Sequence, residues 1–96
     1  MKPLCAAQED QTYRAFIERL KYLRARRRMT QRDLALVIGK PQSYVSKVER
    51  VERRLDIAEF RIWVLAMDHD PIAEFVQVSK GLLEAINDED LLAGDA

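Results

Sequence analysis

Hydrophobic residues recur at intervals of three and four along most of this chain, a spacing that predicts helices rather than strands. The first apolar stripe comprises Tyr13, Phe16, Ile17, Leu20 and Leu23. Four arginines follow it closely, Arg24, Arg26, Arg27 and Arg28. Because the helix dipole favours positive charge at the C-terminal end, we expect the first helix to end near these arginines.

A second, short helix is predicted directly after the arginines. The Thr30 side chain can accept a hydrogen bond from the free amides of the next turn, as an N-cap residue does. Leu34, Ala35 and Ile38 would form the buried face of this helix. Gly39 ends it, because glycine enters the left-handed conformation without strain.

A third short helix follows a tight turn. Pro41 suits a first helical position, since proline lacks the amide hydrogen that would go unpaired there. Val45 and Val48 lie on one side of this helix, and most of its other side chains are polar. The second and third helices, joined at Gly39, make a helix-turn-helix.

The fourth helix has clear start signals. Asp56 and Glu59 form a capping-box pair at its N-terminus. Its apolar stripe consists of Phe60, Val64 and Met67. Trp63 lies next to this stripe, and we interpret it as a core residue.

A fifth helix is predicted near the C-terminus, capped by Asp70 and opened by Pro71. Its apolar stripe contains Ile72, Phe75, Val76, Leu82, Leu83 and Ile86. Gly81 weakens the run, so we expect the helix either to end there or to continue to about Asn87. The residues after it form an acidic tail.

These elements predict an all-α fold of five helices. Three glycines and three prolines supply few of the turns that an all-β fold needs. Short connections indicate that successive helices pack together. We expect a disordered segment over residues 1–10, a helix-turn-helix domain over residues 11–80, and a C-terminal extension over residues 81–96.

Charge is distributed unevenly, although the formal net charge of the 96 residues is zero. From Tyr13 to Arg54 there are thirteen Lys or Arg residues and four acids, which is a net charge of +9. The rest of the chain carries three bases and twelve acids, a net charge of −9. Such a distribution is typical of a basic working surface with an acidic tail. The alternative is chance clustering of charge on a solvated surface.

The predicted third helix has a polar, slender outer face that could enter the DNA major groove. Its first turn would present Gln42 and Ser43 to base edges. Glutamine can make a bidentate pair with adenine, and a lysine such as Lys47 suits the acceptors of guanine. The alternative is an ordinary solvated helix surface.

The spacing of residues through this region resembles the helix-turn-helix of the lambda repressor and Cro, often called XRE-type. The resemblance rests on the pattern Thr30-Gln31-x-x-Leu34-Ala35-x-x-x-Gly39-x-x-Gln42-Ser43-x-Val45-Ser46-Lys47-x-Glu49. It extends over about residues 13–76. The resemblance implies a five-helix, lambda-repressor-like DNA-binding domain with the helix-turn-helix formed by helices two and three.

The resemblance also implies roles for single residues. Gln42, Ser43 and Lys47 would contact bases. Gln31 would contact a phosphate and brace Gln42, and Glu49 would have a structural role after the third helix. From charge and position, we add further candidates for phosphate contacts: Lys40, Tyr44, Arg50, Arg53 and Arg54. Tyr44 could equally be a packing residue.

Three positions depart from the family's usual pattern. Arg28 and Val51 stand where glycine is common, and glycine would allow a positive φ. We therefore expect these two loops to follow different paths. Pro41 stands where a capping Ser or Thr is usual.

The sequence offers no support for an enzyme, because it contains no visible catalytic triad, metal set or phosphate-binding glycine loop. His69 has no second metal-type ligand nearby, and we interpret it as a solvated loop residue; we expect no metal or cofactor. Cys5 is the single cysteine, so an internal disulfide is excluded. With no apolar run of membrane-spanning length and no signal peptide, we expect a cytoplasmic protein without membrane contact.

Double-stranded DNA and a second copy of the chain are the predicted partners. We expect a repressor that binds a pseudo-palindromic operator as a homodimer, because paired recognition helices would meet successive major grooves. Leu82, Leu83 and Ile86 are the predicted dimer interface, although they could pack back onto the first helix. The alternative function is that of an antitoxin, which would bind DNA and hold a protein toxin through the C-terminal region.

Overall fold

The computed structural model describes the backbone of residues 6–81 and the side chains of residues 11–81. Four helices have defined bounds: α1 (Ala6–Arg26), α2 (Gln31–Ile38), α3 (Gln42–Glu49) and α4 (Ile57–Ala66). A fifth helical segment occupies residues 71–81. The described residues contain no strand, so the all-α fold of five helices is confirmed.

The first helix begins earlier than its apolar stripe. It starts at Ala6, inside the segment over residues 1–10 that we expected to be disordered, so that expectation is wrong for residues 6–10. The sequence there is Ala-Ala-Gln-Glu-Asp, which has no hydrophobic period but contains good helix formers. Residues 1–5 lie outside the described part of the chain.

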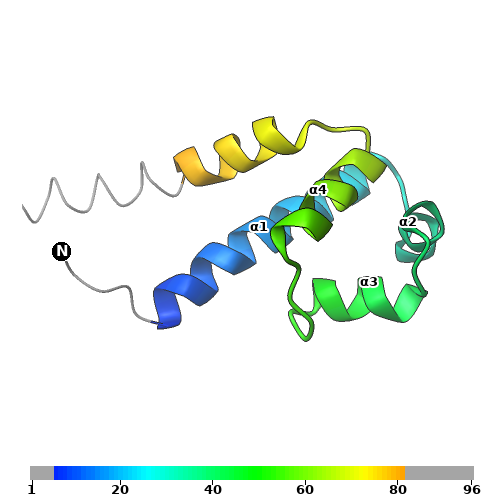
Figure 1. Ribbon diagram of the computed structural model, residues 1–96, viewed down its shortest axis with the longest axis horizontal. Coiled ribbons are helices and arrows are strands. Elements are labelled where there is room, and N and C mark those ends of the chain that lie inside the picture. The colour runs from blue at the N-terminus through cyan, green and yellow to red at the C-terminus, as the bar shows by residue number, and fades with distance from the viewer. Residues whose placement is uncertain (1–5, 82–96) are drawn as a thin grey trace, which may run out of the picture.

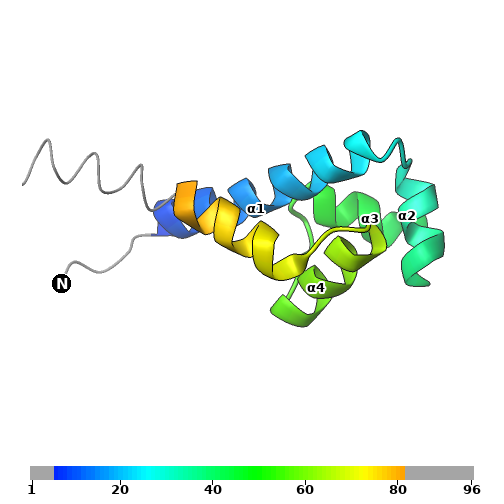
Figure 2. The same cartoon turned by 90° about the horizontal axis from the view of Figure 1, so that it is seen from above.

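The helices form two regions (Figure 1). At one end, α2 and α3 meet at the tight turn and pack against α1 and α4. At the other end, the fifth helical segment runs back along α1 in the opposite direction, as both Figure 1 and Figure 2 show. A ring contact and an ion pair help to hold it there: the Phe16 and Phe75 rings stack at a centroid distance of 5.4 Å, and Arg19 Nε donates to Glu74 Oε2 at 2.6 Å.

The core lies where α1, α2, α3 and α4 converge. Ten hydrophobic residues form one buried cluster: Ile17, Leu20, Leu23, Leu34, Ala35, Val45, Val48, Trp63, Val64 and Met67. The three- and four-residue spacing therefore identifies the buried faces of α1 to α4 correctly. The fifth segment is different, because its buried residue is Glu74 while Ile72 is 74% exposed.

The predicted starts of α2, α4 and the fifth helical segment are present. Thr30 accepts a hydrogen bond from Asp33 N, and the Asp33 carboxylate accepts one from Thr30 N, so the cap of α2 is reciprocal. Asp56 and Glu59 form the same arrangement at the start of α4. Asp70 Oδ1 accepts a hydrogen bond from Ile72 N at 3.0 Å. These caps satisfy amides that have no partner within the helix.

Three helices end in Schellman motifs whose left-handed residue is not glycine. After α1, Arg28 has φ +56°, and the adjacent amides donate to Ala25 O and Arg24 O. After α3, Val51 has φ +63° with the same pair of hydrogen bonds, and after α4 Asp68 has φ +58°. Glycine is the usual residue at such positions because it has no Cβ to clash.

The loops at Arg28 and Val51 thus keep the left-handed turn that glycine would allow. We expected the loops to follow different paths because glycine is absent. That expectation is wrong for φ of Arg28 and Val51, which is positive at both residues. The paired hydrogen bonds and the packing on either side impose the turn, and the side chains adopt it under strain.

Candidate nucleic-acid interface

Helix α3 has one buried and one exposed face. Val45 and Val48 are fully buried and anchor the helix on the core. Gln42, Ser43 and Lys47, the predicted base contacts, are all exposed. The three side chains therefore lie on the surface that a groove-binding helix would present.

The start of α3 is shifted by one residue from the prediction. Pro41 is the N-cap residue, with φ −66° and ψ 152° and no side-chain cap, so it is not the first helical residue. Gln42 and Ser43 are consequently the first two residues of the helix. The first turn of α3 presents both side chains to solvent.

Glu49 joins the end of α3 to α1. Its carboxylate accepts hydrogen bonds from Arg24 Nε at 2.7 Å and Arg24 Nη2 at 2.8 Å. The Arg24 side chain also donates from Nη1 to the carbonyl oxygen of Met29 at 2.9 Å. The Glu49 side chain is only 4% exposed, so this bidentate pair fixes the end of α3 against α1. It gives Glu49 the structural role that the resemblance implies.

Gln31 takes part in the same network. Its Nε2 donates to Glu49 Oε1 at 3.0 Å. The predicted bracing of Gln42 is not among the described hydrogen bonds, which place the Gln31 amide on Glu49 instead. Sequence reasoning missed Arg24, which it treated only as positive charge near a helix end. The signal available was an Arg in the last turn of the first helix together with a Glu at the end of the recognition helix.

Tyr44 turns toward α4 rather than outward. Its hydroxyl donates to Glu59 Oε2 at 2.9 Å and accepts from Trp63 Nε1 at 3.3 Å. Its ring packs edge-on against Trp63 at a centroid distance of 6.0 Å. The structure therefore gives Tyr44 the packing role that the sequence left open.

The cationic phosphate candidates border α3 on both sides, and all of them are exposed: Lys40, Arg50, Arg53 and Arg54. Arg50 pairs with Glu52 in the loop after α3. The Arg53 guanidinium donates to Glu59 Oε2 at 2.9 Å, and the Arg54 guanidinium lies 4.4 Å from the centroid of the Tyr13 ring. Cations in this arrangement can bind DNA phosphates on either side of a helix that lies in the major groove.

The Glu59 carboxylate is held ionised by its surroundings. The backbone amide of Asp56 makes the largest contribution to lowering the pKa of Glu59, and the Tyr44 hydroxyl and Arg53 lower it further. Burial raises the pKa of the Tyr44 hydroxyl, and the neighbouring carboxylate raises it further. Tyr44 is thus a neutral donor to a charged acceptor at neutral pH.

A family model and a solved structure match this chain. The helix-turn-helix family model matches residues 20–67, which is half of the chain. A solved structure, an XRE-family like protein from Pseudomonas syringae pv. tomato str. DC3000, aligns with 36% sequence identity and a TM-score of 0.73. The alignment covers 75% of this chain and 88% of that one.

The chain belongs to the XRE-type helix-turn-helix family. It is a DNA-binding transcription regulator by this membership. No curated protein matches the chain.

The matched range runs from Leu20, in the C-terminal third of α1, to Met67, directly after α4, so it contains the whole helix-turn-helix of this XRE-type protein. The predicted dimer residues, Leu82, Leu83 and Ile86, lie outside the described residues. Among residues 6–81, no helix is long and apolar enough to cross a membrane. The same residues contain no group of three or more metal-ligating side chains placed to hold an ion.

Proposed function

We propose that this XRE-type regulator binds a pseudo-palindromic operator as a homodimer and represses transcription by blocking the polymerase. The observation that supports the reading of DNA bases is the exposed face of α3, which carries Gln42, Ser43 and Lys47. The opposite face of the helix is anchored in the core by Val45 and Val48. Gln42 pairs with an adenine and Lys47 with a guanine in the major groove.

Phosphate contacts set the register of α3 in the groove. Lys40 precedes the helix, and Arg50, Arg53 and Arg54 follow it, so the two flanks contact the backbones of both strands. Gln31 contributes a further contact. An amide nitrogen carries two hydrogens, so Gln31 can keep its bond to Glu49 and donate the second hydrogen to a phosphate.

Fluorescence anisotropy with operator and with random-sequence DNA tests the base contacts. Gln42→Ala should lower the ratio of specific to non-specific affinity by about 10-fold, because one bidentate pair contributes about 1–3 kcal/mol of discrimination. The matched control is Gln11→Ala, which also removes an exposed glutamine, but from the N-terminal half of α1 instead of from α3. Equal ratios for Gln42→Ala and wild type would refute the assignment.

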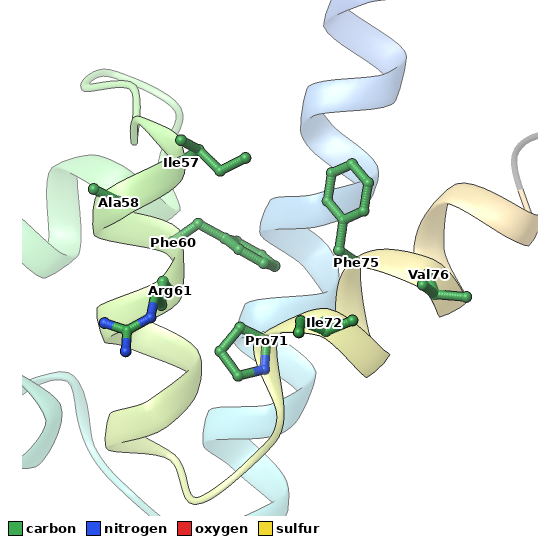
Figure 3. Close-up of a pocket in the computed structure, with 8 residues that line it drawn as sticks. All are labelled: Ile57, Ala58, Phe60, Arg61, Pro71, Ile72, Phe75 and Val76. Carbon is green, nitrogen blue, oxygen red and sulfur yellow. The ribbon is translucent and has the colours of Figure 1, made fainter.

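An apolar groove supports the homodimer part of the proposal (Figure 3). It lies between α4 and the fifth helical segment and has a volume of about 400 Å³. Ile57 on α4 is 77% exposed, and Ile72 and Val76 on the fifth segment are 74% and 53% exposed. Contiguous exposed apolar surface of this kind marks an interaction site.

We assign a second copy of the chain to this groove. One recognition helix reads only a few base pairs, so the operator requires pairing. A standard interface buries about 800 Å² per partner, which makes the groove the centre of a larger contact. The sequence extends the apolar positions of the fifth segment into Leu82, Leu83 and Ile86, which would enlarge it.

Sedimentation equilibrium tests the pairing. Ile72→Glu should dissociate the dimer, because it places a carboxylate in the apolar centre of the contact. Leu36→Glu is the matched control, since Leu36 is also 74% exposed but lies on α2. A wild-type protein that is monomeric at high concentration would refute the dimer. Co-purification of a different protein, lost in Ile72→Glu, would favour the antitoxin function instead.

A further inference from the structure

Tyr44 is the residue of α3 that connects the recognition helix to cations on both of its flanks. The Lys40 ammonium, from the turn before α3, lies 5.6 Å from the centroid of the Tyr44 ring. The Arg53 guanidinium, from the loop after α3, lies 4.6 Å from the same centroid. Both distances are within the range of a cation–π interaction.

The hydroxyl of Tyr44 is committed to other groups. A tyrosine hydroxyl has one hydrogen to donate, and Tyr44 donates it to Glu59 Oε2 at 2.9 Å. A phosphate at neutral pH offers acceptor oxygens, so it needs a donor. Tyr44 could bind a phosphate only by breaking its bond to Glu59.

The ring is held rigidly in place. Trp63, which is 1% exposed, packs against it and donates from its indole nitrogen to the Tyr44 oxygen at 3.3 Å. Glu59 accepts from Tyr44 and from Arg53 on the same oxygen atom, Oε2. The carboxylate thus fixes the tyrosine and one of the two cations together.

We infer that Tyr44 is a positioning residue for phosphate binding, which holds Lys40 and Arg53 in place before DNA arrives. Long cationic side chains lose rotamer freedom when they bind a phosphate. Ordering them in the free protein reduces that loss, which is the advantage of preorganisation. This inference rests on the proposed DNA-binding function and replaces the predicted phosphate contact of Tyr44 with an indirect role.

The test is the affinity for DNA at one salt concentration in three proteins: wild type, Tyr44→Phe and Tyr44→Leu. Tyr44→Leu removes the aromatic face for both cations, so each must be ordered when DNA binds, and the affinity should fall by roughly 5- to 150-fold. The slope of log affinity against log salt should stay at the wild-type value, because the same cations still neutralise the same phosphates. Tyr44→Phe keeps the aromatic face and should retain most of the wild-type affinity.

Two outcomes would overturn the inference. If Tyr44→Phe loses as much affinity as Tyr44→Leu, the hydroxyl rather than the ring supports phosphate binding. If Tyr44→Leu weakens binding by the same factor in a protein that already carries Lys40→Ala and Arg53→Ala, the residue has only a structural role. The ratio of specific to non-specific affinity should stay at the wild-type value in both variants, because phosphate contacts carry no base information.

A measurement on the wild-type protein covers the case in which Tyr44→Leu does not fold. The side-chain protons of Lys40 and Arg53 should show upfield ring-current shifts in NMR spectra without DNA. Unshifted resonances would overturn the inference. The proposed function fails separately, through wild-type binding that does not respond to salt at all.

Discussion

Arg28 offers a direct test of the backbone strain after α1. It has φ +56° at the left-handed position of the Schellman motif, and its side chain is exposed. Replacing it with glycine removes the clash between Cβ and the backbone and loses no buried surface. We predict that Arg28→Gly stabilises the protein.

The magnitude follows from two opposing effects. A non-glycine residue in the left-handed region costs roughly 1–2 kcal/mol. Glycine loses more backbone entropy on folding, which offsets roughly 0.5–1 kcal/mol of the gain. The net stabilisation is therefore about 0.5–1 kcal/mol, which corresponds to a rise in Tm of about 3–6 °C for a domain of this size.

Thermal denaturation followed by circular dichroism measures the effect, and two controls separate strain from charge. Arg28→Ala removes the same charge but keeps the Cβ, so its Tm should stay below that of Arg28→Gly. Arg14→Gly removes an exposed arginine within α1, where glycine should lower stability by about 1 kcal/mol. The reasoning is refuted if Arg28→Gly melts at or below the temperature of Arg28→Ala.

Val51 is also strained, because its φ is +63° and its side chain is β-branched. Unlike the exposed Arg28 side chain, the Val51 side chain packs partly against the core, so its removal also loses packing. Val51→Gly relieves the strain but removes apolar contacts, at about 0.8 kcal/mol for each fully buried methylene. We predict a smaller gain than for Arg28→Gly, measured by the same melting experiment. A larger gain would show that the Val51 side chain contributes nothing to packing.

Two further predictions concern ion pairs and pH. Arg24→Ala should lower the free energy of unfolding by about 3 kcal/mol in urea denaturation, because it leaves the buried Glu49 carboxylate without a counter-charge and with only the hydrogen bond from Gln31. Lys21→Ala breaks an exposed ion pair and should cost less than about 1 kcal/mol. Equal losses in the two variants would contradict the role of burial. Hydrogen bonds, chiefly from the Thr30 and Asp56 backbone amides respectively, lower the pKa values of Asp33 and Glu59. The stabilisation that these hydrogen bonds provide is present above the pKa values of the unfolded state and is lost as pH falls through the pKa values of the folded state. The Tm should therefore drop in acid below about pH 4. The drop should be less steep in the double variant Asp33→Asn with Glu59→Gln, which lacks both carboxyl groups.

The sequence was most informative where one local signal decides one local structure. Thr30 and Asp56 start helices because their side chains accept from nearby amides, and Gly39 ends α2 with φ +71°. Such features depend on a few adjacent residues. They could therefore be predicted without knowledge of the tertiary fold.

Long-range partners could not be predicted in the same way. Arg24 and Glu49 are 25 positions apart, and Arg19 and Glu74 are 55 apart, so no local pattern links them. The turn at Arg28 also escaped prediction, because tertiary packing and hydrogen bonds imposed a conformation that arginine disfavours.

Selection of binding sites from a random DNA pool tests the central claim, which is that the exposed face of α3 reads bases. We predict that the wild-type protein enriches one two-fold symmetric site, and that Lys47→Ala loses its preference at specific positions of that site while keeping the others. A pool with no enriched sequence, or the same preference at every position in both proteins, would contradict the account.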